Sequence, residues 1–312
     1  MKLDIIGDIH GCAEELVSLL EKLGYSKQDG FYKHPDRTVL FIGDYIDRGF
    51  RNFETVRIVR AMVEARTARA IMGNHEHNAI GFHTTDRKSN GMPLREHSKD
   101  NINQHQSFLD EASRFPDEAK AVLAWFKTLP LFIEVNGARF VHACWHQPTI
   151  DKIRTRLNPD NSMSEEFLLS SFEKQADANA AIEMLLKGPE HSLPTGVEFT
   201  DKGGKKRTKA RLAWWKSPPL KLKEGLINIP DTDCLPDEDM PVKSFTGFET
   251  SVSSPLIFIG HYWESGTPTP LSPKVACVDY SVAKGGALCC YRWDGETDFR
   301  TDKYVIVQSV EI

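Results

Sequence analysis

Three clusters of acidic, histidine and asparagine side chains lie near the start of the chain, each directly after a short apolar run. They are Gly7-Asp8-Ile9-His10-Gly11, Gly43-Asp44-Tyr45-Ile46-Asp47-Arg48-Gly49 and Gly73-Asn74-His75-Glu76. Carboxylate and amide oxygens together with imidazole nitrogens are suitable ligands for divalent metal ions. Two such ions, roughly 3.5–4 Å apart, can bridge a nucleophilic water and the phosphoryl oxygens of a phosphoester. The clusters therefore predict metal-dependent phosphoester hydrolysis.

Asp44 is the candidate to bridge the two ions, because it follows the central one of three predicted strands. Mixed nitrogen and oxygen ligation favours borderline ions such as Mn, Fe, Zn or Ni over Ca. The other candidate ligands form two sets, which are Asp8 and His10 for one ion and Asn74, His142 and His261 for the other.

Each candidate also has an ordinary structural interpretation. A lone Asp after a strand is more often a helix N-cap than a metal ligand. The glycines of the motifs would serve tight turns between strand and helix. An isolated His142 or His261 would normally be a hydrogen-bonded histidine of the core. The metal interpretation is favoured because six candidate ligands occur together, in the expected order, at predicted strand ends.

Apolar periodicity predicts the elements that must position these side chains. Runs at 3–6, 38–42 and 68–72 are typical of short buried strands, and apolar residues between them recur at helical spacing. This β–α–β–α–β order implies a parallel sheet with right-handed crossovers. Ligands gather at the carboxyl ends of the strands in such sheets. All three clusters lie at those ends.

The rest of the chain predicts a more mixed structure. The polar stretch 83–107 reads as a surface excursion beside the site, and a strand, Asn136-Gly137, strand pattern predicts a hairpin. Residues 151–254 read as a cap-like insertion, helical and then loop, within a single domain spanning 1–312. The other predicted helices are 118–127, 165–172 and 178–187, and the other predicted strands are 131–135, 139–142, 256–259, 274–278, 287–293 and 304–310.

Composition excludes several function classes. The formal net charge of -5 argues against a dedicated nucleic-acid binder, which needs a basic face. No apolar stretch approaches the ~18–20 residues that span a bilayer, so no membrane partner is expected. Asp4, Asp8 and His10 interrupt any secretory signal. Six scattered cysteines without metal-site spacing indicate reduced thiols, and a cytoplasmic location is predicted.

The motifs resemble those of the calcineurin-like metallophosphoesterases and, within them, the phosphoprotein phosphatase superfamily. That signature is GDxHG, GDxxDRG, GNHE and two later isolated histidines. The first three match the clusters above, and the histidines match His142 in Val141-His142-Ala143 and His261 in Gly260-His261. The resemblance covers the N-terminal half and the C-terminal strands, not the middle. It implies an α/β (α+β) metallophosphoesterase fold, with a central β-sandwich flanked by helices.

The resemblance also implies a function for each matched residue. His75 would protonate the leaving oxygen with Asp47 orienting it, and Arg48 would clamp the phosphate through its planar fork. A metal-bound hydroxide would attack in line without a covalent intermediate. Two divalent ions are implied as cofactors, with Mn²⁺ favoured and Fe, Zn or Ni as alternatives. The implied metal ligands are Asp8, His10, Asp44, Asn74, His142 and His261.

The substrate class is less clearly indicated. His142-Ala143-Cys144 is closer to the His-Ala-Gly of bacterial symmetrical diadenosine tetraphosphatases than to the His-Gly-Gly of protein phosphatases. A dinucleoside polyphosphate or another phosphomonoester is therefore the favoured substrate, and a Ser/Thr phosphoprotein is the alternative. A catalytically silent phosphate- or RNA-binding module is a further alternative, which the complete ligand set disfavours.

A basic run in the middle of the chain allows two interpretations. In one, Arg207 or Arg211 is a second phosphate clamp and Trp214-Trp215 stacks on a nucleobase. In the other, the run is a solvated hairpin around Gly203-Gly204 and the tryptophans pack in the core. The family places a second arginine between the last two histidines, which makes Arg211 the candidate for substrate binding. The basic residues of the run are Lys202, Lys205, Lys206, Arg207, Lys209 and Arg211.

Overall fold

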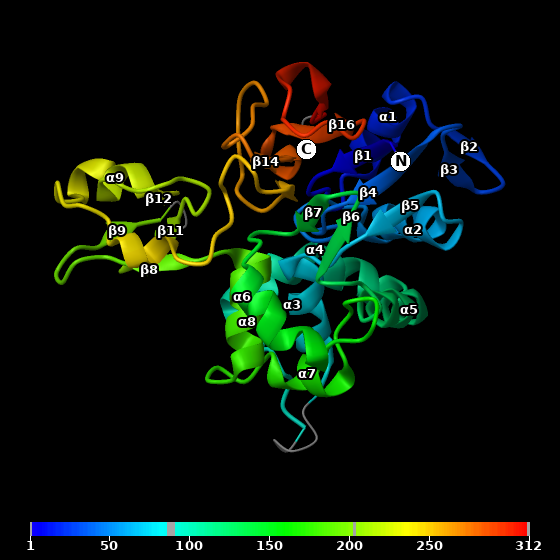
Figure 1. The fold of residues 1–312 in the computed structure, drawn as a ribbon. Coiled ribbons are helices and arrows are strands. Elements are labelled where there is room, and N and C mark those ends of the chain that lie inside the picture. Colours follow the sequence, from blue (N-terminus) through cyan, green and yellow to red (C-terminus); the bar gives the residue numbers. More distant parts are fainter. Residues whose placement is uncertain (1, 86–90, 202–203, 311–312) are drawn as a thin grey trace.

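Two β-sheets lie at the centre of the structure, a computed structural model that describes residues 2–85, 91–201 and 204–310 (Figure 1). The larger sheet contains β1 (Lys2–Ile6), β4 (Arg37–Phe41), β5 (Ala68–Ala70), β15 (Asp279–Tyr280), β16 (Ala287–Trp293) and β17 (Tyr304–Gln308), and the smaller contains β6 (Phe132–Val135), β7 (Ala138–Val141), β13 (Leu256–Ile259) and β14 (Val275–Cys277). The strand order of the larger sheet is β15-β16-β1-β4-β5, with β17 paired to β16. The strand order of the smaller sheet is β14-β13-β7-β6.

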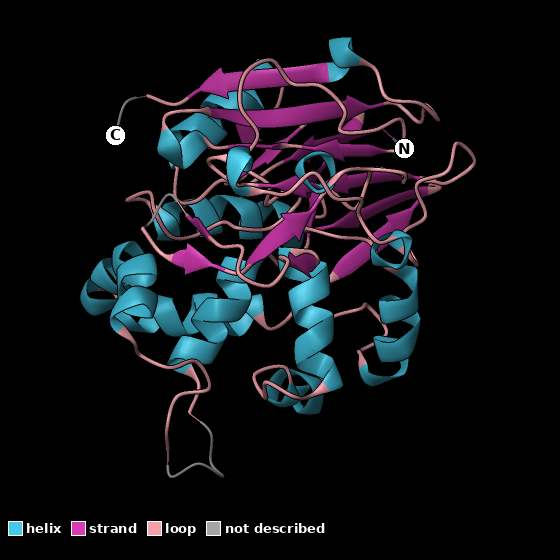
Figure 2. Cartoon of the chain, turned by 90° about the vertical axis from the view of Figure 1, so that its left-hand side faces the viewer, coloured by secondary structure: helices cyan, strands magenta, loops and turns pink. Residues whose placement is uncertain are grey.

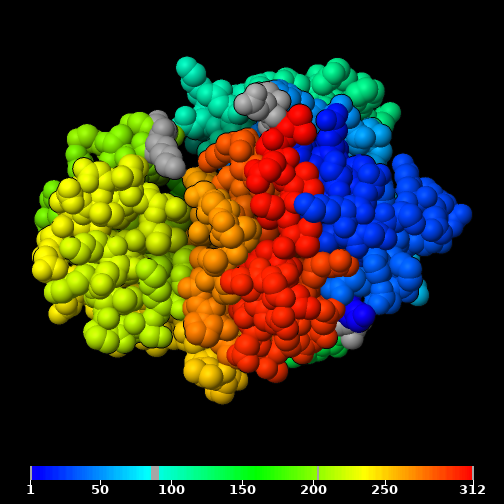
Figure 3. Space-filling view, turned by 90° about the horizontal axis from the view of Figure 1, so that it is seen from above, coloured from blue at the N-terminus to red at the C-terminus, as the bar shows by residue number. Residues whose placement is uncertain are grey.

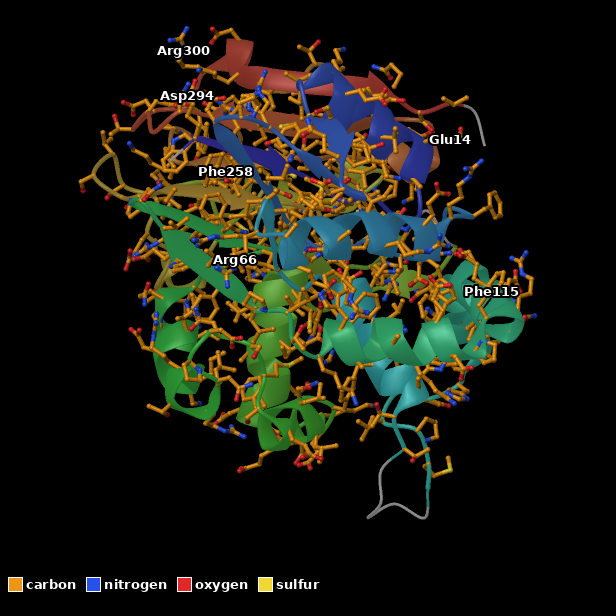
Figure 4. The ribbon with its side chains drawn as sticks, turned by 90° about the vertical axis from the view of Figure 1, so that its right-hand side faces the viewer. Glu14, Arg66, Phe115, Phe258, Asp294 and Arg300 are labelled. Atoms are coloured by element: carbon orange, nitrogen blue, oxygen red, sulfur yellow. The ribbon has the colours of Figure 1, made fainter. Side chains whose placement is uncertain are left out.

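The two sheets enclose an apolar layer to which both contribute side chains. Leu3 and Ile5 of β1 belong to this layer, whereas Ile6 belongs to the cluster on the other face, as the period of two in a strand requires. Phe140 of β7 stacks on Phe258 of β13 with ring centroids 5.1 Å apart, and Figure 4 shows Phe258 in the interior. The predicted sandwich is therefore confirmed.

Two helices connect the first three parallel strands and cover the outer face of the larger sheet. They are α1 (Ala13–Lys22) and α2 (Asn52–Glu64), and β1, β4 and β5 pair in parallel, as predicted. Leu16, Leu19 and Leu20 of α1 share one core cluster with the apolar residues on that face of β4. The small hairpin of β2 (Ser26–Gln28) and β3 (Phe31–Lys33) was not predicted, because its strands are only three residues long.

Further helices gather on one side of the sandwich, below the strands in Figure 2. They are α3 (Asn74–His83), α4 (Lys99–Arg114), α5 (Pro116–Phe126), α6 (Gln147–Ile153), α7 (Glu165–Ser170) and α8 (Asp177–Lys187). The short helix α9 (Leu222–Gly225) lies apart from them, beside β12 (Leu226–Ile227) (Figure 1). The predicted surface excursion at 83–107 is wrong over its second part, which forms α4. Its residues 86–90 lie outside the described residues. Helix α4 buries His105, Phe108 and Glu111, three residues apart, so its polar sequence hides one packed face.

The segment 151–254 contains more β-structure than the helical and loop-like insertion predicted there. Helices α7 and α8 occur as expected, but strands follow them, and this part lies beside the C-terminal strands in Figure 3. Residues Lys202 and Gly203 of the predicted hairpin lie outside the described residues. The strands are β8 (Glu190–Ser192), β9 (Phe199–Thr200), β10 (Lys206–Arg207), β11 (Lys209–Leu212) and β12 (Leu226–Ile227), in the orders β12-β11-β8 and β10-β9.

Short 3-10 helices complete the structure. They are η1 (Arg154–Arg156), η2 (Thr232–Cys234), η3 (Val242–Phe245), η4 (Val282–Lys284) and η5 (Thr301–Lys303). Within the described part of the chain, no helix combines the length and the apolar character needed to cross a membrane.

Candidate metal centre and active site

The predicted ligands follow the carboxyl ends of strands from both sheets. Strands β1, β4 and β5 run parallel to one another, and β7 runs parallel to β13, so their carboxyl ends meet at one edge of the sandwich. Asp8 and His10 follow β1, Asp44 follows β4, Asn74 begins α3 after β5, His142 follows β7, and His261 follows β13.

Several of these residues have a left-handed backbone. The φ angles of His10, Asp44 and His261 are 50°, 53° and 72°. Such conformations are costly for non-glycine residues and cluster at functional sites. Gly43 has a φ of 99°, and a Cβ there would lie 2.5 Å from the nitrogen of Gly73. Only glycine therefore allows the loop that carries Asp44 to approach the loop that carries Asn74.

The carboxylate of Asp44 lies at the centre of the site. Its Oδ1 accepts the backbone N–H of His75 at 2.9 Å. Its Oδ2 faces three imidazoles, and it lies 3.3 Å from Nε2 of His142, 3.7 Å from Nε2 of His10 and 3.9 Å from Nε2 of His75. Asp44 belongs to two possible metal-binding groups, one with His10 and His75 and one with His142 and His261. Asp44 is thus shared by both groups, and its bridging of two ions stays a prediction.

The histidine nitrogens around Asp44 fit a bound cation. The Nδ1 atoms of His10 and His142 lie 2.9 and 2.8 Å from the backbone oxygens of Ile46 and Ile42, so Nδ1 donates and, in the neutral ring, Nε2 carries the lone pair. Among the described residues, Nε2 of His10 and Nε2 of His261 have no hydrogen-bond partner, although both atoms are buried. Buried unpaired polar atoms are unfavourable, and a metal ion would satisfy them. Backbone carbonyls that fix the ring orientation are typical of metal-ligating histidines.

Electrostatics at the centre shifts the pKa values of three of these residues in the direction that favours metal binding. Burial opposes ionisation of Asp44, but the neighbouring imidazoles outweigh it and hold its pKa well below the ordinary value. Burial lowers the pKa of His10, and the charge of Arg48 lowers it further. Burial and Arg211 act in the same way on the pKa of His261. For Asp44, His10 and His261 these directions correspond to an ionised carboxylate and neutral imidazoles, the forms that can coordinate a cation. His142 differs, because the charge of Asp44 outweighs its burial and raises its pKa.

Asp8 and Asn74 lie in contact with this group. Asn74 Oδ1 is 3.2 Å from Nε2 of His142. Both oxygens of Asp8 accept the backbone N–H of His261, at 3.3 and 3.1 Å. Burial and the nearby carboxylate of Asp279 raise the pKa of Asp8. Among the described residues, Asp8 is outside both groups around Asp44, so in this structure it anchors the loop that carries His261.

His75 has the partner expected from the sequence and a further one that the sequence did not reveal. Its Nδ1 lies 2.6 Å from Oδ2 of Asp47, while Oδ1 of Asp47 lies 2.7 Å from Nδ1 of His105. Burial opposes ionisation of Asp47, but the hydrogen bonds from His105 and His75 outweigh it and hold its pKa below the ordinary value. The i, i+3, i+6 spacing of His105, Phe108 and Glu111 was the available signal for this buried histidine.

Glu76 joins two of the loops. Its carboxylate accepts the backbone N–H groups of Gly73 at 2.9 Å, Asp44 at 2.8 Å and Tyr45 at 2.8 Å. Burial and the charge of Asp44 raise its pKa to about 7. Its position three residues after Gly73, at the start of α3, is the sequence signal of a capping glutamate.

A cavity of about 690 Å³ opens beside this centre. Arg48 and Arg211, both predicted to bind substrate, line it together with His75 and His261. Arg211 donates to the backbone oxygen of Lys187 at 2.5 Å, and burial lowers the pKa of its guanidinium. The cationic side chains lining the cavity are Arg48, Arg95, Lys187, Arg207 and Arg211, and the one carboxylate among the described lining residues is that of Asp110.

The aromatic side chains at the cavity differ from those predicted. Trp214 and Trp215 are buried, and Nε1 of Trp214 donates to the hydroxyl of Tyr262 at 3.0 Å. Their interpretation as core residues is therefore confirmed, and stacking on a nucleobase by this pair is wrong. Trp263 lines the cavity instead, with Cζ of Arg48 5.2 Å from its ring centroid, and Phe50 lines it as well.

Comparison with known families agrees with this geometry. Residues 1–209 match the family model of calcineurin-like phosphoesterases. The chain belongs to the calcineurin-like phosphoesterase family. This family is metal-dependent, and its name denotes action on phosphoesters.

Two relatives of this calcineurin-like phosphoesterase share the name bis(5'-nucleosyl)-tetraphosphatase PrpE (asymmetrical). The protein of Halalkalibacterium halodurans is 50% identical over 76 residues, which are 24% of this chain and 31% of that protein. The protein of Bacillus subtilis is 32% identical over 148 residues, which are 46% of this chain and 57% of that protein. The chain thus spans less than two thirds of either relative. Both names specify the asymmetrical activity, whereas the motif resemblance pointed to the symmetrical branch.

A solved structure shares the fold over a larger part of the phosphoesterase. The cold-active protein-tyrosine phosphatase of Shewanella sp. superposes with a TM-score of 0.51 at 17% sequence identity, covering 95% of this chain and 78% of that chain. At this identity the likeness concerns the fold alone. It agrees with the α/β metallophosphoesterase architecture inferred from the motifs.

Proposed function

We propose that this phosphoesterase hydrolyses a phosphoanhydride bond of a dinucleoside polyphosphate of the diadenosine tetraphosphate type. The observation that carries this proposal is the cationic cavity beside Asp44 and His75. Five cationic side chains line it against one carboxylate, although the whole chain has a formal net charge of -5. A local excess of positive charge in a cleft attracts a polyanion. A chain of four phosphates would use cations spread along the cavity.

The cations come from both sides of the cavity. Arg48 lies in the loop after β4, whereas Lys187, Arg207 and Arg211 belong to α8, β10 and β11. Lys187 forms an ion pair with Glu183 and Arg207 forms one with Asp201, and these ion pairs hold both cations in place at the cavity wall. We also propose that residues 1–312 form one domain in which segment 151–254 caps the site, because these three cations reach the cavity from that segment.

The proposed metal site uses the six ligands expected from the motifs. Two divalent ions, of which Mn²⁺ is our first choice, would supply an activated water and neutralise the phosphoryl oxygens. The buried, unpaired Nε2 atoms of His10 and His261 support this site. The proposed ligands are Asp8, His10, Asp44, Asn74, His142 and His261.

The chain's own residues would then bind the substrate and move a proton. Arg48 and Arg211 would hold the phosphates, because a planar guanidinium can donate two parallel hydrogen bonds to a phosphoryl group. His75 would donate a proton from Nε2 to the leaving oxygen, since its Nδ1 is engaged with Asp47. The ionised carboxylate of Asp47 would stabilise the imidazolium form and fix the ring.

The cellular location is part of the same proposal. All six cysteines are free, and five of them are buried. Unpaired thiols are typical of a reducing compartment. We therefore propose a cytoplasmic enzyme that acts on a soluble phosphorylated metabolite.

A substrate comparison tests this proposal. The Mn²⁺-loaded protein is incubated with diadenosine tetraphosphate and, separately, with a phosphoserine peptide and a phosphotyrosine peptide. We expect hydrolysis of the dinucleotide with a kcat/KM at least ~10-fold above that of either peptide, since only the dinucleotide uses all the cations. ADP as the sole product would show that the central phosphoanhydride bond is cleaved. ATP together with AMP would show that an outer phosphoanhydride bond is cleaved.

Asp44→Asn is the control, because it keeps the shape of the side chain and removes its charge. Preference for a phosphopeptide would replace the proposal with a phosphoprotein phosphatase. Binding of the dinucleotide without turnover of any substrate, including 4-nitrophenyl phosphate, would indicate a silent phosphate-binding module.

A further inference from the structure

The carboxylate of Asp47 is held between two imidazoles from different helices. His75, at the start of α3, lies 2.6 Å from its Oδ2, and His105, in α4, lies 2.7 Å from its Oδ1. His105 is only 1% exposed. Because the pKa of Asp47 is held low by these hydrogen bonds, the carboxylate is ionised and accepts from both rings. Nδ1 of His105 must therefore carry a proton.

A third histidine, His83, contacts the other ring nitrogen of His105. Nε2 of His83, at the end of α3, lies 3.2 Å from Nε2 of His105. Burial and the neighbouring His105 lower the pKa of His83 to about 4, so its ring is neutral near pH 7. When His105 is also neutral, its Nε2 accepts the proton of His83, and the proton on its Nδ1 stays directed at Asp47.

Packing leaves His105 little freedom to turn. Its ring stacks on Phe108 with centroids 4.7 Å apart and an interplanar angle of 14°. Helix α4 also holds the backbone of Asp47 through Glu111, whose Oε1 accepts from Nδ2 of Asn52 at 2.7 Å, while Oδ1 of Asn52 accepts the N–H of Asp47 at 2.6 Å. The helix thus fixes both the side chain and the main chain of Asp47.

We infer that His105 is a positioning residue for proton donation by His75, acting through Asp47. Without its N–H, Oδ1 of Asp47 would be a buried oxygen lacking this hydrogen bond, and the carboxylate could rotate away from His75. Small misplacements of a catalytic group cost on the order of 10²-fold in rate. This inference rests on the proposed function, because it assumes that His75 donates the proton.

Two amide variants test the inference as a matched pair. The amide of His105→Asn can place its N–H near the position of Nδ1 and keep the bond to Asp47, whereas that of His105→Gln places it near Nε2, toward His83. We expect His105→Gln to lower kcat on the order of 10²-fold, with KM and bound Mn²⁺ unchanged, and His105→Asn to retain most of the rate. Equal rates in the two variants would overturn the inference.

The leaving group separates proton donation from general damage to the fold. The phenolate of phenyl phosphate is a poor leaving group without a proton, whereas the 4-nitrophenolate of 4-nitrophenyl phosphate leaves readily. We therefore expect His105→Gln to lower kcat more for phenyl phosphate than for 4-nitrophenyl phosphate. A second readout on the metal-free protein is the pair of low-field imidazole N–H proton resonances, of which His105→Gln should remove one and shift the other.

His75→Ala distinguishes the failure of the inference from that of the proposed function. Wild-type rates in His75→Ala would remove the proton donor that the proposed function requires. A slow His75→Ala together with a fully active His105→Gln would overturn only the inference about His105. An equal loss for both aryl phosphates in His105→Gln would also overturn it, because the defect would then not concern the leaving group.

Discussion

Oδ2 of Asp44 lies 3.3 Å from Nε2 of His142, and Nδ1 of the same ring lies 2.8 Å from the backbone oxygen of Ile42. A carboxylate oxygen and an imidazole lone pair face each other at this distance without a proton between them when the ring is neutral. The same holds for His10 at 3.7 Å. The charge of Asp44 raises the pKa of His142, so this pair attracts positive charge. A metal ion would supply that charge to the converging acceptors, which is the physical basis for the proposed metal centre.

Removal of the central charge should empty the site. We expect Asp44→Asn to bind less than one Mn²⁺ per chain, because the amide cannot supply the negative charge shared by both metal-binding groups. His261→Gln should weaken only one of the two sites. Metal analysis after equilibrium dialysis measures both effects. Wild-type metal content in Asp44→Asn would contradict the central position of this residue.

A methyl group at Gly73 should disturb the same carboxylate. A Cβ there would lie 2.2 Å from Oδ1 of Asp44 and 2.8 Å from Oε2 of Glu76. We expect Gly73→Ala to lose metal affinity and to lower the free energy of unfolding by about 1–3 kcal/mol. The control is Gly137→Ala, whose Cβ would meet no atom within 4 Å. Gly137→Ala should keep its metal even though its positive φ costs some stability.

The guanidinium of Arg211 should contribute to substrate binding. Loss of a charged hydrogen bond costs about 1.5–3 kcal/mol, so Arg211→Ala should lower kcat/KM for diadenosine tetraphosphate by roughly 10- to 100-fold. Arg211→Lys should recover only part of this, because an ammonium lacks the planar fork. Steady-state kinetics measures the effect, with Lys206→Ala as the control, since Lys206 pairs with Glu198 outside the cavity lining. Equal losses in Arg211→Ala and Lys206→Ala would refute a specific contact.

The buried ring of His77 should make the fold sensitive to acid. Nε2 of His77 lies 2.8 Å from Oγ of Ser171, which donates to the backbone oxygen of Leu168, so Nε2 donates. Nδ1 is buried and has no partner in the part of the chain that the structure describes. Burial lowers the pKa of His77 to about 3. The unfolded chain binds the proton more readily, so this contribution to stability is complete above about pH 6.5 and falls by about 1.4 kcal/mol per pH unit below it.

Urea unfolding at about pH 7 and about pH 5 measures this loss. The variant His77→Gln keeps an N–H for Ser171 but has no proton to gain. We expect the stability of the wild type to fall by about 2 kcal/mol more than that of the variant over this range. Parallel losses in both proteins would show that other groups cause the acid sensitivity.

Much of the site could be predicted because its signals are local. Asp8, Asp44 and Asn74 each follow a short apolar run, and parallel strands bring such positions to one edge of a sheet. The hairpin of β6 and β7 could likewise be predicted, from the turn residues Asn136-Gly137. By contrast, β2 and β3 are only three residues long, which is too short to leave a pattern.

The sequence alone determined which side chains gather around Asp44, because chain order and strand ends specify that neighbourhood. Only the tertiary structure decided that His105 reaches Asp47, 58 residues away in the chain, and that Trp263 faces the cavity while Trp214 is buried. The physical reason is that a histidine on a polar helix, or a tryptophan beside a basic run, has the same local signature in either environment. Which partner it finds depends on how α4 and the segment after α8 pack against the sandwich.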